Sequence, residues 1–170
     1  MKKQSQLKIG QIFSVPLLGG GFSHGYFTFT DLPLMKLVNV FDFITRSPAV
    51  PIDIESKPLI LVDLRISGEE FDLKKSEVHQ NGERWMLRDR FIASPPLPTS
   101  RFFLQGTRGK ERVIDIFEHL PDRPATDTDR SSLQRHGWDF PPTTTNTIEV
   151  AIRRIDIDPD DFYPDDFRQH

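Results

Sequence analysis

Cysteine is absent from this chain of 170 residues. Its absence excludes disulfides, thiolate nucleophiles and cysteine-ligated zinc together. Long apolar runs are also missing: no segment approaches the ~18 residues of a membrane-spanning helix. Nor does an apolar run follow the basic residues of the N-terminus, as a signal peptide would require. We therefore expect a soluble, cytoplasmic protein with no membrane partner.

Catalytic and metal-binding motifs are lacking as well. The five histidines form neither His-x-His nor His-Glu-x-x-His, and no Gly-x-Ser-x-Gly nucleophile elbow is present. Asp156, Asp158 and Asp160 have the spacing that opens a calcium loop. That loop, however, needs glycine where Asp161 stands and glutamate where Phe167 stands. The sequence thus predicts no catalytic residue, no metal ligand and no cofactor, and we expect that the protein is not an enzyme.

Tyrosine and tryptophan are scarce, with two of each against 14 phenylalanines. Phenylalanine has no polar atom to satisfy, so this composition suits a dry core. The 14 prolines, many of them in the second half, argue against long helices there. The net charge of −3 shows no basic excess of the kind that favours non-specific binding of nucleic acid.

The first third of the chain carries the clearest structural pattern. Phe13, Val15 and Leu17 alternate with small residues, which predicts a strand that lies at a sheet edge or ends at Pro16, because proline lacks the N–H that a ladder needs. The glycine triplet 19–21 predicts a tight turn into a second strand at 22–30. Further strands are predicted at 35–45, 59–66 and 84–92. The strand at 35–45 is apolar on both sides, so we expect it in the sheet interior.

The second half gives weaker signals. Apolar residues at 113, 114, 117 and 120 have helical spacing, which predicts a short helix over 110–120, although the run VIDIF also fits a strand. A turn of helix is expected after Asp127, and alternation at 148–152 predicts a closing strand. Together these patterns indicate a mostly-β (α+β) fold: a strongly bent antiparallel sheet or partly open barrel with one or two short helices. We expect a single domain over 1–155 and an acidic tail over 156–170.

Two segments are candidates for partner binding. The basic segment 84–112 interleaves arginine with aromatic residues, which suits phosphate contact and stacking on bases; its ordinary alternative is core aromatics beside solvated or paired arginines. The tail combines aspartates with aromatic anchors, although a disordered C-terminus also explains it. The candidate contact residues are Arg84, Arg88, Arg90, Asp160, Asp161, Phe162, Tyr163, Asp165, Asp166 and Phe167.

The opening segment resembles the immunity protein 26 family of bacterial polymorphic toxin systems. Members of that family begin with a Lys-x-Gly-x-x-Phe-x-(Val/Ile)-Pro-Leu strand. A glycine-containing turn, a Gly-Tyr step and a Phe-Asp dipeptide follow. This chain matches the pattern at Lys8, Gly10, Phe13, Val15, Pro16, Leu17, Gly25, Tyr26, Phe41 and Asp42. The resemblance covers the first 45 residues and implies a mostly-β protein that binds and neutralises a cognate toxin, with no catalytic residues to carry over.

Three functions therefore remain open at the level of sequence. The first is an immunity-type protein that neutralises a toxin by direct contact, with a toxin domain as its protein partner. The second is a small hydrolase or phosphodiesterase whose site is assembled from dispersed His, Asp and Arg residues. The third is an RNA-binding β-barrel that uses the Arg/aromatic segment.

Overall fold

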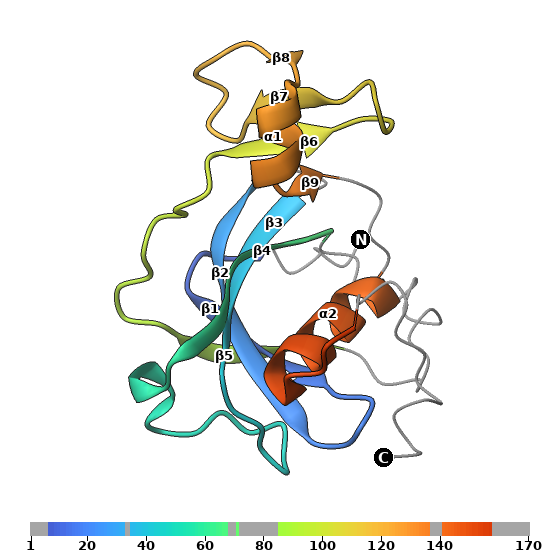
Figure 1. Cartoon of the computed structure of the whole chain (residues 1–170). Helices are drawn as coiled ribbons and strands as arrows, with labels where there is room; N and C mark the ends of the chain where they lie inside the picture. Colours follow the sequence, from blue (N-terminus) through green and yellow to red (C-terminus); the bar gives the residue numbers. More distant parts are fainter. Residues whose placement is uncertain (1–6, 33–34, 68–70, 72–84, 137–140, 158–170) are drawn as a thin grey trace, which may run out of the picture. The chain divides into compact units, whose positions relative to one another are not determined.

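The computed structural model describes residues 7–32, 35–67, 71, 85–136 and 141–157. It is mostly β, with antiparallel sheets and short helices, which confirms the predicted fold class (Figure 1). The contacts of the chain fall into two compact units: unit 1 comprises Met1–Leu97 with Asp139–His170, and unit 2 is Pro98–Trp138. No helix in the described ranges is long and apolar enough to cross a membrane.

Unit 1 is built on a five-stranded antiparallel sheet in the order β4-β3-β2-β1-β5. Its strands are β1 (Gln11–Pro16), β2 (Phe22–Leu32), β3 (Met35–Phe41), β4 (Leu59–Ile66) and β5 (Met86–Phe91). The five strands predicted between residue 13 and residue 92 are all present, and the interior position predicted for β3 is confirmed. The described strands leave the sheet open, with β4 and β5 at its edges.

The edge position offered for the first strand is wrong, because β1 lies between β2 and β5. The alternative, that the strand ends at Pro16, is correct: the Pro16–Phe22 pair is the last of the β1–β2 ladder. A proline at the end of the ladder removes no interior hydrogen bond, so it is compatible with an interior strand.

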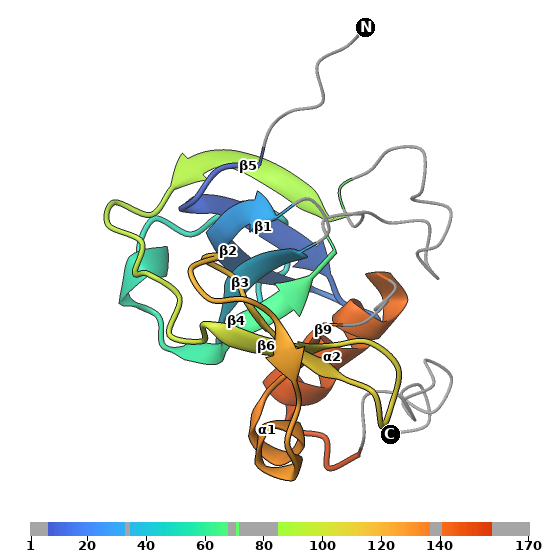
Figure 2. The same cartoon turned by 90° about the horizontal axis from the view of Figure 1, so that it is seen from above.

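Apolar side chains cover both faces of this sheet. On one face, Phe13, Val15, Phe27 and Val38 are fully buried and pack with Ile148 of the helix α2 (Pro141–Arg153), which lies along the sheet in Figures 1 and 2. On the other face, a second cluster is made by Ile12, Tyr26, Phe41 and Ile54, with Phe43, Val50 and Ile92 packed against it. The segment between β3 and β4, which includes the 3-10 turn η1 (Ile54–Ser56), supplies part of this second cover.

The predicted strand at 148–152 is wrong, since these residues form the second half of α2. The apolar positions 148, 150 and 152 alternate, but Ile148 and Ile152 are also four residues apart and lie on one side of a helix. Both are buried in the cluster on the sheet. Five residues of alternation fit either structure, and packing against β1–β3 selects the helix.

Two glycines in the family-like motif are required by close approach. Gly10 has φ of 80°, its N–H donates to the Phe27 carbonyl (2.7 Å), and its carbonyl accepts from the Ile92 N–H (2.8 Å). At Gly25 a Cβ atom would lie 2.5 Å from the Asn39 carbonyl oxygen and 2.6 Å from the Phe13 ring. A side chain at position 25 would therefore collide with both the neighbouring strand and the core.

Unit 2 contains a small sheet in the order β8-β7-β6-β9, in which β6 pairs antiparallel with β7 and parallel with β9. Its elements are β6 (Phe102–Gln105), β7 (Arg112–Asp115), β8 (Arg123–Pro124), α1 (Asp127–Ser132) and β9 (Arg135–His136). One apolar cluster of the unit contains the buried residues Leu104, Val113 and Ala125, with Phe102 and Leu133 packed against them. Phe103, Ile114 and Ile116 are buried as well.

The helix predicted over 110–120 is wrong, and the strand alternative for VIDIF is the correct one, because β7 covers Arg112–Asp115. After this strand the Asp115 carboxylate accepts hydrogen bonds from the backbone N–H groups of Phe117, His119 and Leu120, which turns the chain. The helix expected after Asp127 is present as α1. It begins with a reciprocal capping box between Thr126 and Asp129 and ends at Ser132, before the predicted end near residue 137.

Candidate functional site

Two of the predicted contact residues, Arg88 and Arg90, lie on the edge strand β5 of unit 1. The remaining ones are Arg84 and the tail residues Asp160, Asp161, Phe162, Tyr163, Asp165, Asp166 and Phe167, all of which fall outside the described residues. The acidic-tail hypothesis therefore stays a prediction, and within unit 1 the described cations of the basic segment are those of β5.

Arg90 fixes a loop against β5. Its guanidinium donates to the backbone carbonyls of Pro51 and Ile52, and the Glu55 carboxylate accepts from the Ala93 N–H. Within this loop Ile54 is completely buried, whereas the side chain of Ile52 is 94% exposed. The hydrogen bonds of Arg90 to Pro51 and Ile52 are thus made within unit 1. They fix the backbone of Ile52, whose side chain is exposed.

A buried histidine ties the same region to the sheet. His24 on β2 is fully buried, with Nδ1 3.0 Å from Ser14 Oγ and Nε2 2.7 Å from Thr45 Oγ1. Ser14 Oγ lies 2.8 Å from the Pro48 carbonyl, and Thr45 Oγ1 lies 2.7 Å from the Ser47 carbonyl. A neutral imidazole has one donor and one acceptor, so one of the two hydroxyls donates to the ring and the other to its carbonyl.

The hydrogen-bond network around His24 stabilises the fold and, among the described residues, has no arrangement that could reach a substrate. The Ser14–His24 pair has the residue types of a hydrolytic dyad, but both side chains are fully buried and the hydroxyl contacts Nδ1 beneath the segment 45–48. Burial, together with the smaller effect of the positive charge of Arg88, lowers the pKa of His24 to about 4. His24 is therefore neutral at physiological pH and serves to fasten the segment between β3 and β4.

A pH dependence of stability follows from His24. Its folded-state pKa of about 4 lies below the ordinary value of 6.5, so the unfolded chain takes up the proton first as the pH falls. The contribution of neutral His24 to the free energy of unfolding is fully present above pH ~6.5. It decreases between about pH 6.5 and 4, by up to about 3 kcal/mol. We expect His24→Gln, which keeps hydrogen-bonding groups but does not titrate, to flatten this part of the curve of unfolding free energy against pH. An NMR titration that places the His24 pKa near 6.5 would contradict the prediction.

The aromatic residues of the basic segment 84–112 are mostly used in packing. Trp85 is buried, stacks on Phe13 with ring centroids 5.3 Å apart, and donates from Nε1 to Thr145 Oγ1. Phe103 is completely buried, and Phe102 is half-buried with the Arg101 guanidinium 5.2 Å above its ring. Phe91 is 45% exposed. The core alternative thus holds for Trp85 and Phe103, which leaves fewer rings for stacking on bases.

Three arginines of unit 2 pair with carboxylates, two of which, Asp115 and Glu111, are buried. Arg101 makes two hydrogen bonds to Asp115 (2.9 and 2.7 Å), and the pKa of Asp115 is held well below its usual range by this partner and by backbone N–H donors. Arg130 donates to Glu111 and Asp127, and Arg123 to Asp129. The Arg101–Asp115 and Arg130–Glu111 pairs join residues that are 14 and 19 positions apart in the chain, so they hold separate segments of the unit together.

The cations at the β6–β7 turn are different. Arg108 and Lys110 are exposed, and neither forms an ion pair with any residue that the structure describes. They belong to the basic segment that the sequence singled out, but they are absent from the predicted contact residues. The signal that identifies them is the run GTRGKE (106–111), in which two glycines set a turn with a cation on each side of the second.

The histidines are dispersed over the chain. His24 belongs to unit 1, His119 and His136 belong to unit 2, and His79 and His170 lie outside the described residues. Within the ranges that the structure covers, no three His, Asp or Glu side chains are placed to hold a metal ion. The dispersed site of the hydrolase hypothesis remains an untested prediction.

Comparison of the chain with family models, with curated proteins and with solved structures finds no match.

Proposed function

We propose that this protein is an immunity-type binding protein that neutralises a cognate bacterial toxin by direct contact. The observation that supports the proposal is the role of the motif residues on which the resemblance to the immunity protein 26 family depends. In this structure they shape the sheet of unit 1, and none of them belongs to a catalytic arrangement within the described residues.

Each part of the motif has a structural reason. Phe13, Val15 and Leu17 are in the core cluster, and Pro16 ends β1. Gly25 allows the close approach of β3 and the Phe13 ring. At the end of β3, the Asp42 carboxylate pairs with Arg154 just after α2 (2.6 Å). A motif of this kind specifies a scaffold, so any protein that shares it would carry the same sheet and differ in its surface.

The charge of the chain fits a protein target. With a net charge of −3, an inhibitor of this type would be attracted to a basic target such as a nuclease, and complementary charge speeds the encounter of two proteins. The loop that Arg90 holds in place adds an apolar anchor at Ile52, and rigid presentation of such an anchor lowers the entropy cost of binding.

Co-expression tests this function. Toxin domains encoded next to the gene would be expressed in a host together with this chain or with an empty vector, and growth and complex formation measured. We expect restored growth and a stoichiometric complex in size-exclusion chromatography at moderate salt. If every such toxin kills cells that contain the folded chain, and no complex forms at micromolar concentration, the proposal is wrong.

A further inference from the structure

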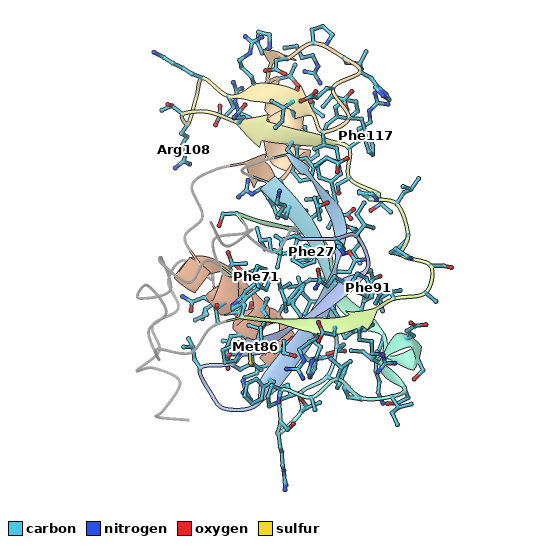
Figure 3. All side chains as sticks on the ribbon, turned by 180° about the vertical axis from the view of Figure 1, so that it is seen from behind. Phe27, Phe71, Met86, Phe91, Arg108 and Phe117 are labelled. Carbon is cyan, nitrogen blue, oxygen red and sulfur yellow. The ribbon has the colours of Figure 1, made fainter. Side chains whose placement is uncertain are left out.

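The turn between β6 and β7 is a rigid, positively charged tip. It carries three exposed cations, Arg108, Lys110 and Arg112, which we call the basic tip. Gly106 and Gly109 have φ of 110° and 85°, values that favour glycine, and the Lys110 N–H donates to the Thr107 carbonyl (2.8 Å). Figure 3 shows the labelled Arg108 extending away from the ribbon of this hairpin.

A buried carboxylate fixes the shape of the basic tip. The side chain of Glu111 is 1% exposed and accepts hydrogen bonds from the Gly109 N–H and from Arg130 Nε, both at 2.9 Å. The Arg112 guanidinium donates to the Asp122 carbonyl (2.7 Å), which restrains the third cation. A preformed loop loses less conformational entropy on binding than a mobile one, so the cations are presented in a binding-ready arrangement.

Among the described residues of unit 2, none forms an ion pair with the basic tip. Four carboxylates of the unit pair with other cations: Glu111 and Asp127 with Arg130, Asp115 with Arg101, and Asp129 with Arg123. The partner of Arg112 is a carbonyl oxygen, which carries no net charge. Among the described residues, the three cations therefore have no carboxylate in ion-pair contact, whereas Arg101, Arg123 and Arg130 do.

Unit 2 itself is an insertion. The chain leaves unit 1 after Leu97 and re-enters it at Asp139, with the elements β6 to β9 in between. Segments inserted into a scaffold commonly carry recognition, because they vary without disturbing the scaffold core. The motif that resembles the immunity family lies wholly in unit 1, so unit 2 is free to differ between relatives with different partners.

We propose that the basic tip is a contact surface for a carboxylate-rich patch on a protein partner; the inference rests on the proposed function, since that function supplies the partner. Aromatic rings that could stack on bases are not part of the tip: Phe103 is fully buried and Phe102 lies under Arg101. Single-stranded nucleic acid needs such stacking platforms, so isolated cations on a rigid turn match carboxylates better.

Charge reversal tests this contact with the toxin domain as the binding probe. The double variant Arg108→Glu/Lys110→Glu reverses two of the three positive charges of the basic tip, and Lys8→Glu/Arg46→Glu makes the same change of net charge at two exposed cations of unit 1. We expect the first variant to weaken binding to the toxin by at least about tenfold, mainly through slower association and with a smaller salt dependence. The control should stay within about twofold. Equal losses in the two variants would overturn the proposal while leaving the toxin-binding function intact.

A second measurement keeps the inference testable if no toxin is bound. The ¹⁵N-labelled full chain would be titrated with an octaglutamate peptide and, separately, with a dodecamer of thymidine nucleotides. We expect the peptide to shift the amide signals of residues 106–112, and the shifts to vanish in the Arg108→Glu/Lys110→Glu variant. Stronger shifts of these signals with the oligonucleotide, or none with either probe, would overturn the assignment of a carboxylate-binding surface.

Discussion

Replacing Glu149 with alanine is expected to lower the free energy of unfolding by about 2–3 kcal/mol, because it removes a buried acceptor of three hydrogen bonds. The Glu149 side chain on α2 is completely buried, and its two oxygens accept from the N–H groups of Leu18 (2.9 Å) and Gly19 (3.1 Å) in the turn after β1. One of these oxygens also accepts from Arg153 Nε, and Arg153 donates in turn to the Gly20 carbonyl. A single carboxylate thus fastens the helix to the glycine turn.

Chemical denaturation followed by circular dichroism measures this effect. The matched control is Glu55→Ala, which also removes a carboxylate that accepts a backbone N–H, but at an exposed position. We expect the control to cost less than about 1 kcal/mol, since water replaces the lost partner there. Glu149→Gln should fall between the two, because it keeps an acceptor and loses the charge. Similar losses for Glu149→Ala and Glu55→Ala would show that the buried clamp does not stabilise unit 1.

Replacing Asp115 with alanine is expected to destabilise unit 2 by about 3 kcal/mol or more. The Asp115 side chain is 1% exposed and receives two hydrogen bonds from Arg101 and three from the backbone N–H groups of Phe117, His119 and Leu120. Its loss leaves Arg101 and these N–H groups without their acceptor.

Hydrogen exchange of the full chain resolves this effect by region. Amides of β6 and β7 should exchange faster in Asp115→Ala, whereas amides of the β2–β3 ladder in unit 1 should change little. Asp127→Ala is the control, since its carboxylate is fully exposed although it also pairs with an arginine. The pKa of Asp115 is depressed, so its stabilising effect is present above the ordinary carboxyl pKa and is lost as the pH falls toward its folded-state pKa. Unchanged exchange in unit 2 would contradict the role assigned to Asp115.

The strands of unit 1 were predictable because their evidence is local. Alternation at Phe13, Val15 and Leu17, the glycine triplet, and the two-sided apolar run in β3 each depend on residues that are neighbours in the chain. The same holds for α1, whose capping box lies within four residues, Thr126 to Asp129. Periodicity misled where the pattern was short. Alternation at 148–152 predicted a strand where α2 forms, and helical spacing over 110–120 predicted a helix where β7 forms.

The partner of each charged side chain was decided only by the tertiary structure. The sequence identified a basic segment but could not show that Arg90 holds the carbonyls of Pro51 and Ile52, or that Arg101 pairs with Asp115. Nothing near Glu149 in sequence points to Leu18, which is 131 residues away. Such pairs depend on the path of the whole chain.

By itself, then, the sequence determined the fold class, the strands of the first sheet, and the exclusion of cysteine chemistry. The tertiary structure decided which cations form hydrogen bonds or ion pairs within their own unit and which remain exposed at the surface. The physical reason is that backbone periodicity is set by adjacent residues, whereas the burial and pairing of a charge are set by segments brought together from far apart. That distinction separates Arg90 and Arg101, which hold their own units together, from Arg108 and Lys110, which face solvent on a fixed turn.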